Sequence, residues 1–236
     1  RLRAIDWAKT PIGPVESWPM GLRVAVQVML NSRFAMWMAW GEELTFFCND
    51  AYWPTLGVKQ PWALGSPAAR VWEEIWPDIG PRIRRVFESG DATWDEALLL
   101  FLERSGYPEE TYHTFSYGPI PGDHGTIDGM LCVVSEETER VIGDRRLGLL
   151  RSVASGLTAV QTEEWLFNAM RRSIEGDPRD LPFTLTYLLD DEGHSAHLAC
   201  STGIAPGHPA APSIIEIGDG RSPWPVREIL NGLTGW

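Results

Sequence analysis

The chain is poor in cysteine and in long apolar stretches, and each shortage excludes a class of protein. Its three cysteines, Cys48, Cys132 and Cys200, lie far apart without the spacing of a metal site. So few thiols, in an odd number, fit a reducing compartment better than a disulfide framework. No run of 18 apolar residues is present, and the charged, mixed start does not resemble a signal peptide. We therefore expect a cytoplasmic protein without a membrane span.

Basic residues are also in short supply. The chain has 20 lysine and arginine residues against 32 aspartate and glutamate residues, which gives a formal net charge of −12. Such a chain repels nucleic acid and anionic membrane surfaces, so we expect neither as a partner. What is abundant is tryptophan, with twelve residues. Because this side chain is large and rigid, the number predicts an aromatic core or a ligand pocket.

Turn residues and apolar periodicity predict an α+β domain over the first 136 residues. Ser17-Trp18-Pro19 is typical of a helix start, and apolar residues at helical spacing follow as far as Leu30. The later elements are expected in the order strand 34–40, strand 44–48, short helical pieces, helix 79–88, and strands 94–102, 110–120 and 127–135. Five antiparallel strands with helices on one face form an α+β fold.

A second, different region begins near residue 136. Residues 136–175 lack proline and are rich in Glu, Arg and Leu, which predicts a helix over 137–161 and another over 162–174. A hairpin (183–189 and 196–201), a strand (214–217) and a short helix (224–230) are expected to follow. A sheet this small has unpaired edges, so we expect the second domain to be truncated.

Three segments resemble those of PAS sensor domains. In 44–52, Asn49 is placed to cap the first helix after the hairpin. Segment 115–120 resembles the PAS strand that ends in proline and an aliphatic residue. Segment 131–140 resembles the last strand and its Asp-x-Thr exit motif, with Glu136 where the family usually has Asp.

The resemblance extends to the bacterial PAS–GAF sensor kinases. Residues 10–14 and 17–19 resemble their N-terminal cap, and residues from about 147 onward resemble the start of a GAF domain. The expected domains are an N-terminal cap and helix (1–32), a PAS sensor domain (33–136), a signalling linker helix (137–161) and a truncated GAF domain (162–236). This resemblance implies a sensory input module of a signal-transduction protein, a histidine kinase, that relays a small-molecule or other signal.

Cofactor and metal signatures are missing. Haem-binding PAS domains of one type carry a His on the helix before the meander, and 77–88 has none. No Cys is followed by Arg, which the photoreactive flavin signature requires, and Cys200 has no bilin-attachment context. His194 and His197 fall on opposite sides of a predicted strand and cannot converge with Cys200 on a metal. We expect no cofactor and no metal.

No catalytic constellation is predicted either. Asp95 and Glu96 are adjacent on a predicted strand, so they point to opposite faces and cannot act as an acid–base pair. The fragment is therefore not expected to be an enzyme by itself, although a longer protein could be a histidine kinase.

A ligand pocket, if there is one, is expected inside the PAS core. The predicted core residues are Trp37, Phe46, Tyr52, Trp72, Ile83, Phe87, Leu99, Phe115 and Cys132. The predicted ligand contacts among them are Phe46, Tyr52, Trp72, Phe87 and Phe115. His113, Phe115 and Tyr117 share one strand face, and Tyr112, Thr114 and Ser116 share the other. The sequence leaves open which face lines the cavity.

The linker helix has an apolar arc wider than one coiled-coil seam. Leu147, Leu150, Ala154 and Leu157 step at heptad spacing, and we assign them to a parallel homodimer seam. Ile142, Leu149, Val153 and Val160 are assigned to domain cores. The alternative is that the whole arc packs within one chain.

Two functions are compatible with these features, and the volume of the PAS core separates them. A void of about 300 Å³ or more favours a sensor of small molecules. A packed aromatic core favours a PAS module that binds no ligand and only interacts, dimerises and transmits.

Overall fold

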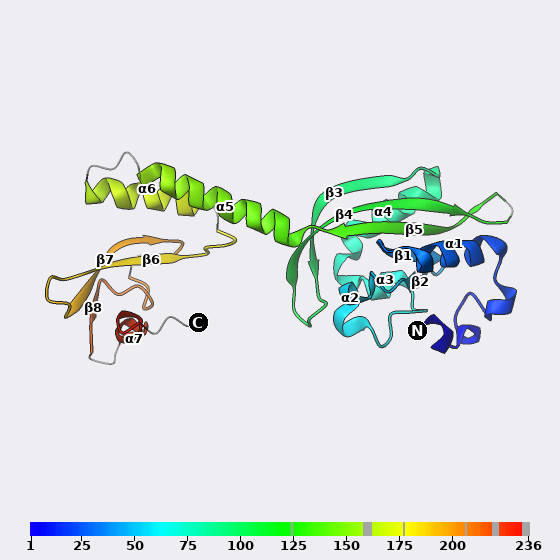
Figure 1. The fold of residues 1–236 in the computed structure, drawn as a ribbon, viewed down its shortest axis with the longest axis horizontal. Helices are drawn as coiled ribbons and strands as arrows, with labels where there is room; N and C mark the ends of the chain where they lie inside the picture. Colours follow the sequence, from blue (N-terminus) through cyan, green and yellow to red (C-terminus); the bar gives the residue numbers. More distant parts are fainter. Residues whose placement is uncertain (124, 158–161, 177, 206, 219–221, 233–236) are drawn as a thin grey trace. The chain divides into compact units, whose positions relative to one another are not determined.

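The computed structural model describes residues 1–236 except 124, 158–161, 177, 206, 219–221 and 233–236 (Figure 1). The chain divides into two compact units, Arg1–Val141 and Ile142–Trp236. Helix α5 (Thr138–Leu157) begins in the first unit and continues in the second. It corresponds to the linker helix predicted over 137–161, whose last four residues lie outside the described part of the chain.

The first unit is built on one antiparallel sheet. Its strands are β1 (Ala35–Trp40), β2 (Thr45–Cys48), β3 (Thr93–Leu102), β4 (Glu109–Pro121) and β5 (Ile127–Glu136). They pair in the order β2-β1-β5-β4-β3, with every pairing antiparallel. The predicted α+β fold, with two strands, a helical crossover and a three-strand meander, is confirmed.

Helices cover both faces of this sheet, so the prediction of helices on one face is wrong. The helices are α1 (Met20–Asn31), α2 (Trp53–Leu56), α3 (Ala68–Val71) and α4 (Trp76–Ser89). Five 3₁₀ turns accompany them, at Leu2–Ala4, Trp7–Lys9, Val15–Ser17, Gly57–Lys59 and Glu73–Ile75. Side chains alternate along β1, so Trp37 and Ala39 join the core under α3 and α4, whereas Met38 and Trp40 join the core under α1.

Asn49 fixes the end of β2 to its surroundings, and it caps the turn before α2 rather than α2 itself, whose N-cap is Tyr52 without a side-chain hydrogen bond. Its Oδ1 accepts from the backbone N–H of Tyr52 (3.0 Å), just before α2, and from that of Met36 (3.1 Å). Its Nδ2 donates to the backbone carbonyls of Met29 (3.1 Å), Ser32 (3.3 Å) and Phe34 (2.8 Å). One buried side chain thus ties the end of α1 to the hairpin of β1 and β2.

The predicted start of α1 needs a small correction. The helix begins at Met20 with Pro19 at its N-cap, and no side chain caps it. Ser17 instead ends a 3₁₀ turn, where its hydroxyl donates to the carbonyl of Pro14 (2.7 Å). The serine therefore serves the preceding turn and not the helix.

The second unit contains most of α5 and a small sheet. Its other elements are α6 (Glu163–Glu175), β6 (Thr184–Leu189), β7 (Ser195–Thr202), β8 (Ile214–Glu216) and α7 (Val226–Leu230). The strands pair antiparallel in the order β6-β7-β8. Thr162 caps α6, because its hydroxyl accepts from the N–H of Trp165 (3.3 Å). The predicted helices and hairpin are present, and their assignment to a GAF domain stays a prediction.

Candidate functional site

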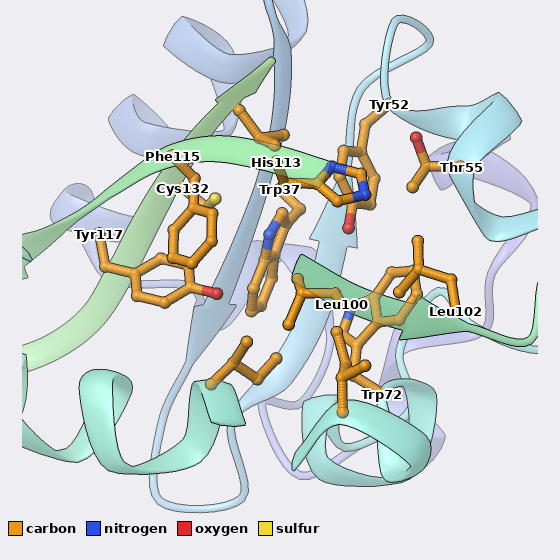
Figure 2. Close-up of a pocket in the computed structure, with 13 residues that line it drawn as sticks. Trp37, Tyr52, Thr55, Trp72, Leu100, Leu102, His113, Phe115, Tyr117 and Cys132 are labelled. Atoms are coloured by element: carbon orange, nitrogen blue, oxygen red, sulfur yellow. The ribbon is translucent and has the colours of Figure 1, made fainter. Parts of the chain in front are cut away.

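The first unit contains a small cavity between its sheet and the segments around α2 and α4 (Figure 2). The lining residues are Trp37, Tyr52, Thr55, Trp72, Ile75, Ile79, Leu100, Leu102, His113, Phe115, Tyr117, Cys132 and Val134. The cavity volume is about 30 Å³. That is room for one or two water molecules. It is far below the roughly 300 Å³ at which small-molecule pockets begin.

Aromatic rings fill the space that a ligand would need. Trp37 stacks on Phe46 with 5.4 Å between the ring centroids, and Tyr52 meets Trp72 edge-on at 6.0 Å. Figure 2 shows several of these rings side by side around the cavity. Such stacked and edge-on pairs are the favourable arrangements for aromatic side chains. The tryptophan and tyrosine rings of this core therefore pack mainly against one another.

The structure brings three of the five predicted ligand contacts together. Tyr52, Trp72 and Phe115 line the cavity. Phe46 is fully buried in the same core but does not line it. Phe87 is only half-buried and lines a separate open groove of about 630 Å³ beside α4.

One predicted core residue, Leu99, is placed wrongly, because β3 contains a bulge. Asp95 pairs with Phe115 of β4, and the next regular pair joins Leu98 to His113. The extra residue reverses the alternation, and Ala97 takes a positive φ of 46° within it. Leu98 therefore faces the core, and Leu99 is left half-buried on the other face. Nothing in the run of leucines signals the bulge.

His113 lies on the face of β4 that lines the cavity, together with Phe115 and Tyr117. Its side chain is 4% exposed, and its Nε2 lies 3.1 Å from the hydroxyl oxygen of Thr111. Burial lowers the pKa of His113 because it disfavours the charged ring. The carboxylate of Glu136 works in the opposite direction, and the guanidinium of Arg104 adds to the lowering.

The other polar groups of the cavity are neutral at ordinary pH. Burial raises the pKa values of Tyr52, Tyr117 and Cys132 well above their usual range. The indole nitrogen of Trp72 is buried without a hydrogen-bond partner among the described residues. Of the residues that line the cavity, His113 is thus the group whose ordinary titration range lies nearest neutral pH.

A polar network joins the neighbours of His113 to the start of α5. It contains the exit segment, Glu136-Glu137-Thr138. Arg104 donates two hydrogen bonds to the carboxylate of Glu136, at 2.8 and 3.0 Å. The hydroxyl of Thr138 donates to the same carboxylate (2.9 Å) and accepts from the N–H of Tyr112 (3.0 Å). Burial opposes ionisation of Glu136, but the bonds from Arg104 and Thr138 hold its pKa below the usual value.

The second residue of the exit segment is anchored separately. Glu137 accepts a hydrogen bond from the hydroxyl of Thr114 and pairs with Arg140. Its N–H also donates to the carbonyl of Tyr112 (2.8 Å). β4 therefore holds the beginning of α5 through alternate residues. Sequence reasoning identified the exit motif but not Arg104, which is 32 residues from its partner Glu136.

Within the second unit, the apolar residues of α5 form an exposed set and a half-buried set. Leu147 and Leu150 are 44% and 66% exposed, and Ala154 is exposed as well. The residues assigned to domain cores, Ile142, Leu149 and Val153, are half-buried. The side chain of Leu157 and the whole of Val160 lie outside the described residues.

The contacts of α5 with α6 lie on another side of the helix. The hydroxyl oxygens of Ser152 and Ser173 are 3.2 Å apart, and Gly156 packs near Ala169. At 100° per residue, Ser152 lies about 200° around the helix from Leu150. The exposed leucines therefore face away from α6.

The described residues bring no three His, Cys, Asp or Glu side chains into a cluster that could hold a metal ion. Among them, no helix combines the length and the apolar character needed to cross a bilayer.

No protein-family model and no curated protein matches the sequence. Solved structures do resemble it. An RNA-binding light-oxygen-voltage receptor is 19% identical, with a TM-score of 0.41 over 64% of this chain and 43% of its own. A PAS domain from Colwellia psychrerythraea is 15% identical, with a TM-score of 0.39 over 50% of this chain and 98% of its own. A sensory box sensor histidine kinase from Vibrio cholerae is 15% identical, with a TM-score of 0.35 over 49% of this chain and 90% of its own.

This chain thus spans less than half of the light-oxygen-voltage receptor that it resembles. At such identities and scores, no ligand, chromophore or output activity passes from those proteins to this one.

Proposed function

We propose that the chain is a regulatory PAS module that transmits a change in its first unit through the exit segment to α5, without binding a bulky ligand in its core. The observation that carries this proposal is the filled core. A cavity of about 30 Å³ supports the non-ligand-binding function of the two considered. The hydrogen bonds around Glu136 and Thr138 connect the first unit directly to the start of α5.

The output side of the proposal is a homodimer through the seam of Leu147, Leu150, Ala154 and Leu157. A contiguous exposed apolar stripe on a helix commonly marks an interaction surface. The exposure of Leu147 and Leu150, on the side facing away from α6, supports a second copy as that surface. A two-stranded seam would carry a tilt or rotation of α5 to both copies together. The output domain of a longer protein would then be a histidine kinase or another dimeric enzyme.

Sedimentation of the purified chain tests the seam. The wild type should form a dimer, and Leu150→Glu should be monomeric, because two like charges would meet at the seam. Arg151→Gln is a matched control that makes the same change in net charge beside the seam, and it should remain dimeric. A wild type that stays monomeric at high concentration would refute the seam.

The absence of a cofactor is tested by absorption. The haem histidine and the flavin cysteine signature are missing, so the purified protein should be colourless. A visible absorption band would contradict this and would require a site other than the small cavity.

A further inference from the structure

A filled core has no space for a bulky ligand, but a proton needs none. We propose that protonation of His113 is the signal that the first unit passes to the first turn of α5, an inference that rests on the proposed function. The ring is buried at the cavity, and its residue pairs directly with Glu136 across β4 and β5. His113 therefore lies between the aromatic core and the exit segment.

The hydrogen bonds define which ring nitrogen can take up the proton. The hydroxyl of Thr111 donates its one hydrogen to the carbonyl of Leu100 (2.8 Å). At its contact with His113 it can therefore only accept, so Nε2 carries the hydrogen of the neutral ring. Nδ1 is left as the site of protonation. The cavity beside the ring has room for a water molecule that could deliver the proton.

The charged and titratable groups around His113 come from several elements. Glu136 approaches from β5, and Arg104 approaches from the turn between β3 and β4. Tyr52, Tyr117 and Cys132 border the same cavity but stay neutral, because burial raises their pKa values. A charge on the imidazole would thus act mainly on the ion pair of Glu136 and Arg104.

The consequence of protonation follows from how Glu136 is used. Its carboxylate is shared between Arg104 and the hydroxyl of Thr138, which in turn holds the N–H of Tyr112. An imidazolium attracts the carboxylate and repels the guanidinium, so it competes for the bonds that hold Thr138. The first turn of α5, in which the N–H of Val141 donates to the carbonyl of Glu137, should then open more often.

Two measurements on the intact chain test this. NMR titration of the imidazoles should show His113 as the Nε2–H tautomer at neutral pH, becoming charged on acidification while the fold persists. Hydrogen exchange at residues 138–141, corrected for the intrinsic effect of pH, should accelerate over the same pH range. If the pKa of His113 differs by one unit between the held and opened forms, the opened population rises about tenfold on full protonation.

Three variants separate this signal from general acid effects. His113→Gln keeps a side-chain N–H for Thr111 but cannot become charged, so the acceleration should disappear. His197→Gln, at an exposed position of β7, should behave as the wild type. Glu136→Gln should lower the pKa of His113 further and abolish the acceleration. The proposal is overturned if His113 stays neutral until the unit unfolds, or if His113→Gln and the wild type respond alike.

The outcome also distinguishes this inference from the proposed function. The exit network lies within the first unit, so monomeric Leu150→Glu should show the same response of residues 138–141. A dimer whose exchange at residues 138–141 does not depend on protonation of His113 would refute the proton signal alone. A monomeric wild type with the full response would refute the dimer relay alone.

Discussion

Arg104 and Glu136 lie 32 residues apart, yet their side chains meet in a two-pronged ion pair of 2.8 and 3.0 Å. Arg104 also donates through Nε to the carboxylate of Glu109 (3.0 Å). One guanidinium thus joins the turn between β3 and β4 to the last residue of β5. Because α5 begins two residues later, this pair fixes the point at which the helix leaves the sheet.

Arg104→Met should therefore weaken the first unit and loosen α5. Loss of three charge-assisted bonds, between side chains that are about a quarter to a third exposed, should cost about 1–2 kcal/mol in the free energy of unfolding. Chemical denaturation and hydrogen exchange at 138–141 would measure the two effects. Arg84→Met, at an exposed position of α4, is the control. Equal stability of the two variants would contradict the role given to Arg104.

The same pair sets the sign of a pH effect. The pKa of Glu136 lies below its usual value of 4.5, so its contribution to stability is fully present above that pH and is lost as the pH falls through the lowered value. His113 acts in the same direction. Because its pKa is lowered in the folded state, the unfolded state binds a proton more readily below about pH 6.5, and the free energy of unfolding falls as the pH falls there. The stability advantage of wild type over Arg104→Met should therefore shrink below pH 4.5. An advantage that grows in acid would show that another group dominates.

Much of the first unit could be predicted because its signals are local. Strand boundaries followed from turns and alternation, and the hydrogen bond between Asn49 and the turn after the hairpin followed from residue type and position. The bulge in β3 could not be predicted, because Leu98, Leu99 and Leu100 are chemically equivalent and only the pairing with β4 decides which of them faces inward.

The candidate site was less predictable than the fold for a related reason. The sequence identified Tyr52, Trp72 and Phe115 as core aromatics, but it could not say whether the rings leave a void between them. Cavity volume depends on rotamers and on packing from several elements at once. The sequence likewise could not predict which face of the sheet α1 covers. Its apolar spacing indicates that one side of the helix is buried, but not the surface against which it packs.

Asn49 should be the most sensitive polar position of the first unit. Asn49→Ala removes an acceptor for one buried and one partly buried N–H group and a donor for three carbonyls, which should cost about 3 kcal/mol or more. Asn49→Asp keeps the acceptor and loses the donor, so it separates the two contributions. Thermal unfolding of both variants, with Asn31→Ala on the exposed end of α1 as control, measures the effect. A loss below 1 kcal/mol for Asn49→Ala would mean that water replaces the side chain.

Lys59 and Glu74 form an ion pair that is almost completely removed from solvent, with side chains 8% and 13% exposed. The ammonium also donates to the carbonyl of Val71 (2.8 Å) and lies 4.4 Å from the ring centroid of Trp72, whereas Glu74 accepts from the N–H of Glu103 (3.1 Å). The pair therefore braces the back of the aromatic core against β3. Each of the two charges is stable in this buried setting only while its partner is present.

Removing one partner should be worse than removing both. Lys59→Met leaves a buried carboxylate without its cation and should destabilise the first unit by about 3–5 kcal/mol. The double variant Lys59→Met/Glu74→Gln removes both charges and keeps an acceptor for Glu103, so it should recover most of that loss. Denaturation curves of the two single variants and the double variant give the coupling energy directly. Additive losses would show that each charge is solvated independently and that the pair does not support the core.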